Sequence, residues 1–346
     1  MVPTKENISE KISQSSIKNE NTLAIFKEIA TSNGISRAEI SANTGLSLMT
    51  VGKVADMLTR EGMITQVKPA TGSAGRRAGM LDISGKHFIL SLDLSTLKFR
   101  ATVMNLKLQA VDSIVYPYND SLFPEDNLII FFRDTSTLLM KHLLSKKLLG
   151  TGICIPGEYD EKNDTIISPR LKQLCDIKIS ETMKKSIGFT PDRIMNSVTA
   201  AAISEISELP EDKRDCAINL NIDSGVCGCI VLKGKVLNRP SDFESLICEN
   251  GKTLAANLFE RAENIDEENL SRQIGSALRA LISVLCPDSV FISGTERNFT
   301  EWFSEMLSKE LSTANCKPQV FFENSKNFRS DTGIAQILRD KSIKEI

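Results

Sequence analysis

The chain has 346 residues, of which 41% are hydrophobic and 25% charged, and its net charge is −2. These values place it with ordinary soluble globular proteins and allow two or three domains. Its apolar runs fall short of the roughly 18 residues of a membrane span, and its polar N-terminus lacks the apolar core of a signal peptide. We therefore expect a cytoplasmic protein without a membrane partner.

Charge is divided unevenly along the chain. Residues 1–86 carry eleven Lys and Arg against eight Asp and Glu, about +3, and the rest carries 31 against 36, about −5. A mildly basic head on an acidic body suits a DNA-reading domain attached to a part that does not touch DNA. The bias is small, so it supports a motif and would not stand alone.

The N-terminal segment begins with a polar stretch. Residues 1–20 show no hydrophobic periodicity and are interpreted as a polar tail or a fraying first helix. From Asn21 to Asn33 the apolar residues follow helical spacing, as Leu23, Ile25, Phe26, Ile29 and Ala30. This pattern predicts a helix that packs under the segment that follows it.

Two helix starts come next, joined by a glycine turn. Ser36 and Glu39 form a capping box, so a short helix runs to about Asn43 and ends before Gly45. Ser47 caps a second helix. The arrangement predicts a helix-turn-helix whose second helix lies in a DNA major groove. An ordinary helical hairpin is the alternative.

A glycine-rich hairpin after these helices favours the DNA-binding interpretation. Strands are predicted at Gly62–Val67 and Met80–Ile83, around a basic tip at Gly72–Arg77. Such a wing touches the phosphate backbone or reaches a minor groove. The predicted DNA-contacting residues are Arg37, Ser47, Met49, Thr50, Lys53, Arg76 and Arg77. For each of them, the alternative to DNA contact is that it is only a solvated surface residue.

Beyond Gly85 the pattern alternates between strands and helices. The predicted elements of the first half are strands at Phe88–Asp93, Phe99–Asn105 and Ala110–Pro117, a helix at Leu128–Leu149, a strand at Gly150–Gly157, helical periodicity over Leu171–Ile187, a strand at Arg193–Asn196 and a helix at Ala200–Ile206. The second half has strands at Asp215–Ile222 and Gly228–Lys233, a helix at Glu267–Leu285 and a strand at Ser289–Ile292. This repetition predicts two related α/β halves facing a cleft, where ligands bind outside the carboxyl ends of the strands.

The eight cysteines lie mostly in apolar segments. Reduced thiols pack there as small hydrophobes, and a disulfide framework is not expected in this compartment. Cys227 and Cys229 share a face of a strand and, with Cys248, offer a metal site as the less favoured alternative.

Several segments match the pattern of one known family in order and at suitable spacing. They are Gly45-Leu46-Ser47, Glu61-Gly62, Gly75-Arg76, Gly150 to Gly157, Ser168-Pro169-Arg170 and Cys286 to Ile292. On these residues the chain resembles the ROK (repressor, ORF, kinase) family. The resemblance implies an N-terminal winged helix-turn-helix and an actin-like, sugar-kinase-type (ribonuclease H-like), two-lobed α/β body. The implied domains are a tail at 1–20, a DNA-binding domain at 21–85 and a body at 86–346 for ligand sensing or dimerisation.

The chain departs from the family's kinases at both phosphate-binding turns. The first turn, D-x-G-x-T/K, is Asp93-Leu94-Ser95-Thr96-Leu97-Lys98 here, with serine in place of glycine. The second, G-T-G-x-G-x-G, is Asp223 to Cys229, with three glycines replaced by Asp, Cys and Cys. An aspartate there repels a triphosphate. We expect ATP binding to be lost and no cofactor to be needed.

The family's catalytic and zinc motifs are also missing. Ser197 occupies the position of the catalytic aspartate, and a serine needs an activator to accept a proton. The only histidines, His87 and His142, are expected on the surface. No His and cysteine cluster follows the stretch from Gly234 to Glu244, so we expect no metal. The chain is therefore expected not to be an enzyme.

The resulting prediction is a DNA-binding regulator that represses carbohydrate-related genes. Its partners are double-stranded DNA, a sugar or sugar derivative and a second copy, as a homodimer or a dimer of dimers. The tentative ligand-binding residues are Glu158, Asn196, Ser197, Thr199 and Glu244. Two alternatives remain: an ATP-dependent ROK sugar kinase, and a dimeric DNA-binding scaffold that senses no ligand, in which Asn196 only caps a helix.

Overall fold

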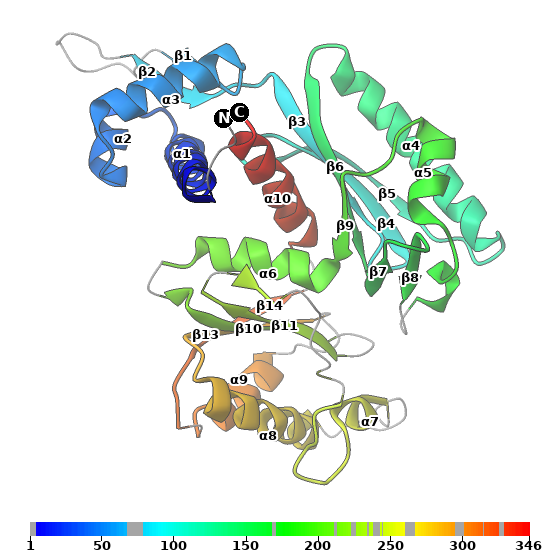
Figure 1. Cartoon of the computed structure of the whole chain (residues 1–346). Helices are drawn as coiled ribbons and strands as arrows, with labels where there is room; N and C mark the ends of the chain where they lie inside the picture. The colour runs from blue at the N-terminus through cyan, green and yellow to red at the C-terminus, as the bar shows by residue number, and fades with distance from the viewer. Residues whose placement is uncertain are drawn as a thin grey trace.

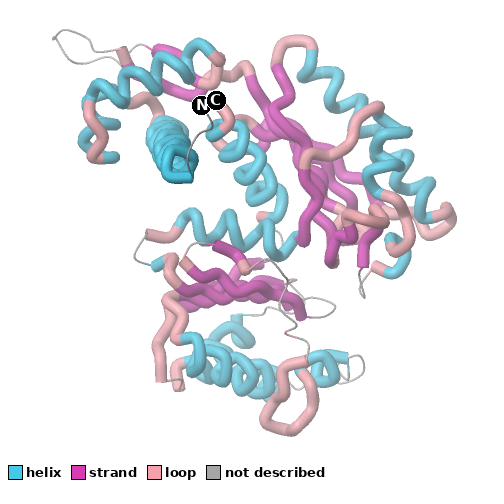
Figure 2. Tube along the Cα trace, in the orientation of Figure 1, coloured by secondary structure: helices cyan, strands magenta, loops and turns pink. Residues whose placement is uncertain are grey.

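The computed structural model describes residues 5–67, 79–167, 171–210, 213–222, 226–233, 235–237, 243, 245–259, 267–294, 301–313, 315–324 and 329–346. The chain forms a small N-terminal head and two α/β lobes, called lobe 1 and lobe 2 in chain order (Figure 1). Each lobe has a sheet with helices on its faces (Figure 2). This is the fold expected from the sequence.

In its described residues, the head has three helices and a two-stranded hairpin. They are α1 (Lys5–Thr31), α2 (Arg37–Thr44), α3 (Leu48–Arg60), β1 (Ile64–Val67) and β2 (Met80–Ile83). The two strands pair antiparallel, with Ile64 opposite Ile83 and Val67 opposite Met80. The hairpin is the base of the predicted wing, and its tip, residues 68–78, lies outside the described ranges.

Helix α1 begins at Lys5, well before the predicted start at Asn21. Residues 1–20 were interpreted as a polar tail or as part of a first helix. From Lys5 onward, the structure has the helix. The lysines, glutamates and glutamine of this stretch favour helix even without an apolar face. Ile25, Phe26 and Ile29 are fully buried, as their spacing predicted.

Lobe 1 is built on a five-stranded sheet of order β5-β4-β3-β6-β9. Its strands are β3 (His87–Asp93), β4 (Lys98–Met104), β5 (Ala110–Pro117), β6 (Lys147–Ile155) and β9 (Arg193–Asn196). The first three form an antiparallel meander, and β6 and β9 extend the sheet in parallel. The remaining elements are α4 (Pro124–Leu143) and α5 (Ile179–Ile187) on the outer face, a 3-10 turn at Lys172–Leu174, and a small hairpin of β7 (Glu158–Asp160) and β8 (Thr165–Ile167).

Lobe 2 repeats this topology. Its sheet has the order β12-β11-β10-β13-β14, again a meander on one side of the first strand and parallel strands on the other. The strands are β10 (Cys216–Ile222), β11 (Val226–Leu232), β12 (Lys235–Val236), β13 (Ser289–Gly294) and β14 (Gln319–Asn324). Its own helices are α7 (Leu254–Phe259), α8 (Glu267–Leu285) and α9 (Glu301–Leu311). The prediction of two related halves is confirmed.

Two further helices are exchanged between the lobes. Helix α6 (Ser197–Glu208) follows a lobe 1 strand but packs Ala202 and Ile206 against the lobe 2 sheet. Helix α10 (Ser330–Lys344) follows a lobe 2 strand but packs Leu338 with Ile89 of lobe 1. The two helices meet between the lobes, α6 in green and α10 in red (Figure 1). Each lobe therefore depends on a helix that the other supplies in sequence.

The crossing of these two helices depends on one glycine. A Cβ atom added at Gly333 of α10 would lie 1.6 Å from the carbonyl oxygen of Ala200 in α6. Because this oxygen belongs to the backbone, no side-chain rotation relieves the overlap. The close approach of α6 and α10 therefore requires glycine at this position.

Two of the predicted helices differ most from the structure. Helix α4 spans Pro124–Leu143 instead of Leu128–Leu149, because Leu148 and Leu149 belong to strand β6. Proline is well suited to the first helical turn, which explains the earlier start. The helical periodicity over Leu171–Ile187 corresponds to the 3-10 turn and α5, separated by a short extended stretch.

The sequence predicted mostly buried, reduced cysteines without a disulfide framework, but Cys286 and Cys316 form a disulfide with a Cα–Cα distance of 5.5 Å. Cys286 precedes β13 and Cys316 precedes β14. Since these strands are parallel neighbours, with Ser289 opposite Gln319, the two cysteines enter the sheet side by side. The sequence separation of 30 residues gave no sign of this proximity.

Within the described ranges, no helix is long and apolar enough to cross a membrane.

Candidate functional site

The first candidate site is the outer face of α3. The inner face of this helix is buried through Val51, Val54, Ala55 and Leu58. On the outer face, Met49 is 71% exposed and Lys53 is exposed as well. The two side chains are four residues apart and so lie on one side of the helix. This face therefore presents one apolar and one cationic group to solvent.

The first turn of α3 is fixed by its cap. The Ser47 hydroxyl accepts the backbone N–H of Thr50 at 3.1 Å, and the two hydroxyl oxygens lie 2.9 Å apart. Ser47 and Thr50 therefore hydrogen-bond to each other. Both were predicted to face DNA, and in the structure their first role is to fix the start of the helix.

The helix before the turn is fixed in the same way. Its capping box is complete: the Ser36 N–H donates to the Glu39 carboxylate at 2.8 Å, and the Glu39 N–H donates to the Ser36 hydroxyl at 3.2 Å. The hydrogen bonds from Ser36 lower the pKa of Glu39. Gly45 ends the helix with a φ of 70°, a left-handed conformation that favours glycine.

Arg37, a predicted DNA contact, is paired within the head. Its guanidinium lies 2.6 Å from the carboxylate of Asp56 on α3. The pair joins the outer sides of α2 and α3, and an added Cβ at Gly52 would lie 3.9 Å from the guanidinium. Asp56 therefore positions the arginine beside α3. The predicted wing contacts Arg76 and Arg77 lie outside the described residues.

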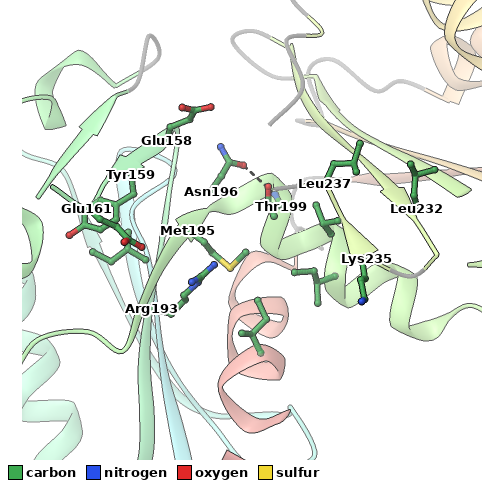
Figure 3. Close-up of a pocket in the computed structure, with 14 residues that line it drawn as sticks. Glu158, Tyr159, Glu161, Arg193, Met195, Asn196, Thr199, Leu232, Lys235 and Leu237 are labelled. Carbon is green, nitrogen blue, oxygen red and sulfur yellow. Dashed lines mark hydrogen bonds between the residues drawn. The ribbon is translucent and has the colours of Figure 1, made fainter. Parts of the chain in front are cut away.

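The second candidate site is a cleft of about 1030 Å³ between the lobes (Figure 3). Lobe 1 contributes β7 and β9, lobe 2 contributes β11 and β12, and the exchanged helices α6 and α10 contribute to its wall. Its lining is Glu158, Tyr159, Glu161, Arg193, Ile194, Met195, Asn196, Thr199, Ile203, Leu232, Lys235, Val236, Leu237 and Ile337. The cleft therefore combines apolar residues with charges of both signs.

Asn196 lies in this cleft and also caps α6. Its amide oxygen accepts the N–H groups of Val198 at 2.9 Å and Thr199 at 3.2 Å, and its amide nitrogen donates to the Gly157 carbonyl at 3.2 Å. These bonds use the oxygen and one amide hydrogen, so a ligand would meet the second hydrogen. The structure thus shows the capping role, and the side chain still lines the cleft.

The other predicted ligand contacts are divided. Glu158 and Thr199 line the cleft together with Asn196. Ser197 begins α6, is 4% exposed and is absent from the cleft lining. Glu244 lies outside the described residues. Sequence analysis missed Tyr159, whose hydroxyl donates to Asp164 at 2.6 Å and whose pKa is raised to about 12, chiefly by burial.

The first phosphate turn is closed by internal hydrogen bonds. One oxygen of Asp93 accepts the Ser95 N–H at 2.8 Å, and the other accepts the Ser330 hydroxyl of α10 at 2.8 Å. The next residue of α10, Asp331, is partly buried, and burial followed by the charge of Asp93 raises its pKa. A phosphate at this turn would meet two carboxyl groups instead of free backbone N–H groups. Of the second turn, Asp223 to Cys229, residues 223–225 lie outside the described ranges, and Val226 to Cys229 belong to β11.

In the described part of the chain, no group of three or more His, Cys, Asp or Glu residues could hold a metal ion. His87 was expected on the surface but is 6% exposed, because it begins β3 where the head meets lobe 1. Burial lowers its pKa. Of the three cysteines considered for a metal site, Cys229 and Cys248 are buried, and burial raises the pKa of both thiols.

Helix α10 connects the cleft with the head. Its Ile337 lines the cleft, and two residues further on, the Arg339 guanidinium lies 5.7 Å from the ring centroid of Phe26 in α1. Arg339 is 6% exposed, and Asp340 pairs with Lys27 of α1 at 3.4 Å. Head and lobe 1 also share one hydrophobic cluster. The head is therefore packed against the body and not attached through a free linker.

A smaller pocket of about 490 Å³ lies on the head side of this connection. Ile203 and Ile337 line both pockets, and Asn19 of α1 lines the smaller one.

Sequence analysis did not predict α10 at all. The apolar spacing of Ile334, Ile337 and Leu338 would have indicated a helix, but nothing local indicates that the helix packs against lobe 1 and the head.

No family model matches the chain. The chain is 24% identical over 237 residues to the xylose repressor of Bacillus subtilis, which covers 66% of the chain and 60% of the relative. It is 26% identical over 253 residues to the xylose repressor of Staphylococcus xylosus, covering 72% and 64%. The chain thus matches less than two thirds of the length of these relatives.

Solved structures share the fold over most of the chain. A ROK family transcriptional regulator, a homologue of the Escherichia coli Mlc protein, has a TM-score of 0.68 and 16% identity, over 95% of this chain and all of that one. A ROK hexokinase from Thermus thermophilus has a TM-score of 0.56 and 18% identity, over 75% of this chain and all of that one. The regulator therefore matches more of the chain than the kinase does.

Proposed function

We propose that this chain, which is related to ROK family transcriptional regulators in sequence and fold, is a sequence-specific DNA-binding protein that represses carbohydrate-related genes. The observation that carries the proposal is the outer face of α3, where Met49 and Lys53 stand exposed on a helix whose turn and cap are fully formed. The printed names of the relatives as xylose repressors support it.

The head places α3 in a major groove. Lys53 faces a base edge or a phosphate, and Arg37, held beside α3 by Asp56, reaches the backbone. Arg76 and Arg77 of the wing hold phosphates or enter a minor groove. The protein acts as a homodimer or a dimer of dimers, whose heads span half-sites one or more helical turns apart.

The body acts without catalysing phosphoryl transfer. Asp93 is already hydrogen-bonded on both oxygens, and Asp331 stands beside it. Ser197 is buried at the position of the family's catalytic aspartate. A body of this kind has no general base at Ser197 and no vacant phosphate turn at Asp93.

The cleft binds a sugar or a sugar derivative that controls DNA binding. Its polar contacts are Glu158, Asn196 and Thr199, and its walls come from both lobes. A ligand that favours one inter-lobe angle shifts α10, and α10 carries the shift to α1 through Arg339 and Asp340. The ligand must bind the two arrangements with different affinity for this to work.

The DNA-binding proposal is tested by selection of genomic fragments with the purified full chain at two salt concentrations. Recovery of a palindromic site upstream of carbohydrate genes at both concentrations is the expected result. Recovery of random fragments whose binding falls steeply with salt would contradict sequence-specific recognition, because that dependence marks phosphate contacts alone.

Two experiments on the body distinguish the two alternatives from the proposal. If the chain is a kinase, coupled ATP turnover with a panel of sugars will be measurable and will fall in Ser197→Ala; we expect no turnover. The scaffold alternative is favoured by the capping role of Asn196. It predicts no ligand-dependent melting shift with any sugar, whereas the sensing proposal predicts a shift that is reduced in Thr199→Ala.

A further inference from the structure

Two neighbouring apolar side chains stand exposed at the start of α3. Leu48 is 60% and Met49 is 71% exposed, although the same helix buries Val51, Val54 and Leu58 completely or nearly so. Single exposed apolar residues are normal. Here two are consecutive, and they lie in the first turn of the helix that the proposed function places in the groove.

The hydroxyl groups of this turn hydrogen-bond to each other. The Ser47 hydroxyl accepts the Thr50 N–H and lies 2.9 Å from the Thr50 hydroxyl, so both hydroxyls are used by the cap. Leu48 and Met49, which stand between them, therefore form the protruding surface of the first turn. The side chains of Leu48 and Met49 themselves can offer only apolar contact to a base edge.

The chemistry of the major groove identifies what such a surface recognises. Each base pair presents acceptors and donors there, and thymine alone adds an apolar group, the C5 methyl. Lys53 lies one helical turn beyond Met49, so a cation for phosphate or for the acceptors of guanine stands behind the apolar pair. A groove with thymine methyls next to a phosphate or a guanine complements this face.

We infer that Leu48 and Met49 are specificity-determining residues that select thymine in each half-site by packing on its C5 methyl group. The inference rests on the proposed DNA-binding function. It assigns sequence preference to the first turn of α3. Arg37 contributes affinity without selecting a base at these positions, because its guanidinium is held by Asp56 at 2.6 Å.

The inference is tested by removing the methyl groups from the DNA. Sites are first selected from random duplexes by the full chain, and each thymine of the selected site is then replaced in turn by deoxyuridine, which lacks only the methyl. We expect one or two positions per half-site at which the replacement weakens binding about fourfold, the value of one buried methyl or methylene group.

Protein variants identify the side chains that make the contact. In Met49→Ala and Leu48→Ala, binding to the thymine site should weaken, and the ratio of thymine to deoxyuridine affinity should fall to about one at the position that each residue contacts. Leu144→Ala is the matched control, because Leu144 is an apolar residue with 86% exposure in lobe 1. This control should keep both the affinity and the ratio.

The outcomes separate this inference from the proposed function. A selected site that lacks thymine, or that tolerates deoxyuridine at every thymine, would overturn the inference and leave the DNA-binding function intact. Selection without any sequence preference would overturn both. The deoxyuridine series uses the unaltered protein, so it decides the question even if a variant fails to fold.

Discussion

The outer face of α3 and the inter-lobe phosphate turn use their side chains in opposite ways. On α3, Met49 and Lys53 project from a capped helix into solvent. At the phosphate turn, Asp93 accepts hydrogen bonds from Ser95 and Ser330 on its two oxygens. The side chains on the head are therefore exposed to solvent, whereas Asp93 at the turn is hydrogen-bonded within the chain and holds the start of α10.

This difference agrees with the proposed recognition of DNA by α3 and the proposed transmission of a ligand signal by α10. A surface that reads another molecule needs groups with few internal partners, while an element that transmits a shift needs groups that are fully bonded. Helix α10 is bonded at its start to Asp93 and near its end to the head.

The largest effect is expected where the two exchanged helices cross. Gly333→Ala places a methyl group on the Ala200 carbonyl oxygen, so α6 and α10 must separate. We expect a loss of more than about 4 kcal/mol in the free energy of unfolding, or no folded protein. Gly85→Ala, where an added Cβ meets no atom within 4 Å, is the control for thermal denaturation. Equal melting temperatures for the two variants would contradict the close approach of α6 and α10 at Gly333.

The junction of α10 with the head should be the next most sensitive place. Asp340→Ala removes the partner of Lys27 and leaves the buried Arg339 without its carboxylate. The expected cost is about 2 kcal/mol in urea denaturation. The variant should also weaken the effect of a cleft ligand on DNA binding. Lys341→Ala, in an exposed pair with Glu345, should be nearly neutral.

A smaller effect, confined to DNA binding, is expected for Lys53→Ala. Loss of this cation should weaken binding about tenfold and, if the contact is to phosphate, reduce the salt dependence of the affinity by about one ion. Fluorescence anisotropy at several salt concentrations measures both. Lys98→Ala removes an exposed lysine of lobe 1 and should change neither quantity. A similar loss of DNA affinity in both variants would mean that Lys53 of the head contributes no more to DNA binding than an exposed lysine of lobe 1.

In the cleft, Asn196→Ala should cost about 1 kcal/mol, because the side chain caps α6 through two N–H groups. Asn196→Asp keeps the capping oxygen but loses the hydrogen bond from the amide nitrogen to the Gly157 carbonyl, so it should recover only part of the loss in the same denaturation experiment. Ligand binding separates the roles further, since a ligand would meet the amide hydrogen that does not donate to the Gly157 carbonyl. An alanine variant as stable as the parent would show that the cap contributes nothing.

The smallest effect concerns Asp331 and depends on pH. Its pKa in the folded state is raised, so its ionised form costs stability, and this cost is absent at low pH and grows as the pH rises through the folded-state pKa. Asp331→Asn should therefore melt a few degrees higher at neutral pH, and the difference should shrink towards pH 4. Calorimetry across this range measures it. A variant that melts lower than the parent at neutral pH would contradict the sign.

The head could be predicted from the sequence because its signals are local. The capping box of Ser36 and Glu39, the turn at Gly45 and the cap at Ser47 each involve residues at most four positions apart, and all are confirmed. Local signals also located the five strands of the lobe 1 sheet and strands β10, β11 and β13 of the lobe 2 sheet, but they did not predict β12 and β14. What they missed at the head was the extent of α1, whose first half has no apolar face to show.

The site at the cleft could be predicted only in part. Glu158, Asn196 and Thr199 follow strand ends, where ligands bind in sheets of this kind, and the structure brings these three together. The exchange of α6 and α10 and the pairing of Cys286 with Cys316 depend on contacts between distant parts of the chain. No local pattern encodes such contacts, so the route from cleft to head came from the structure.

The most direct test of the account compares the affinities of one protein preparation for two duplexes at about 150 mM salt. One duplex carries the selected site, and the other has the same bases in scrambled order. We expect at least about a thousandfold tighter binding to the selected site, the range of specific DNA-binding proteins. Equal affinities with equal salt dependence would contradict it, because the head would then hold phosphates without reading a sequence.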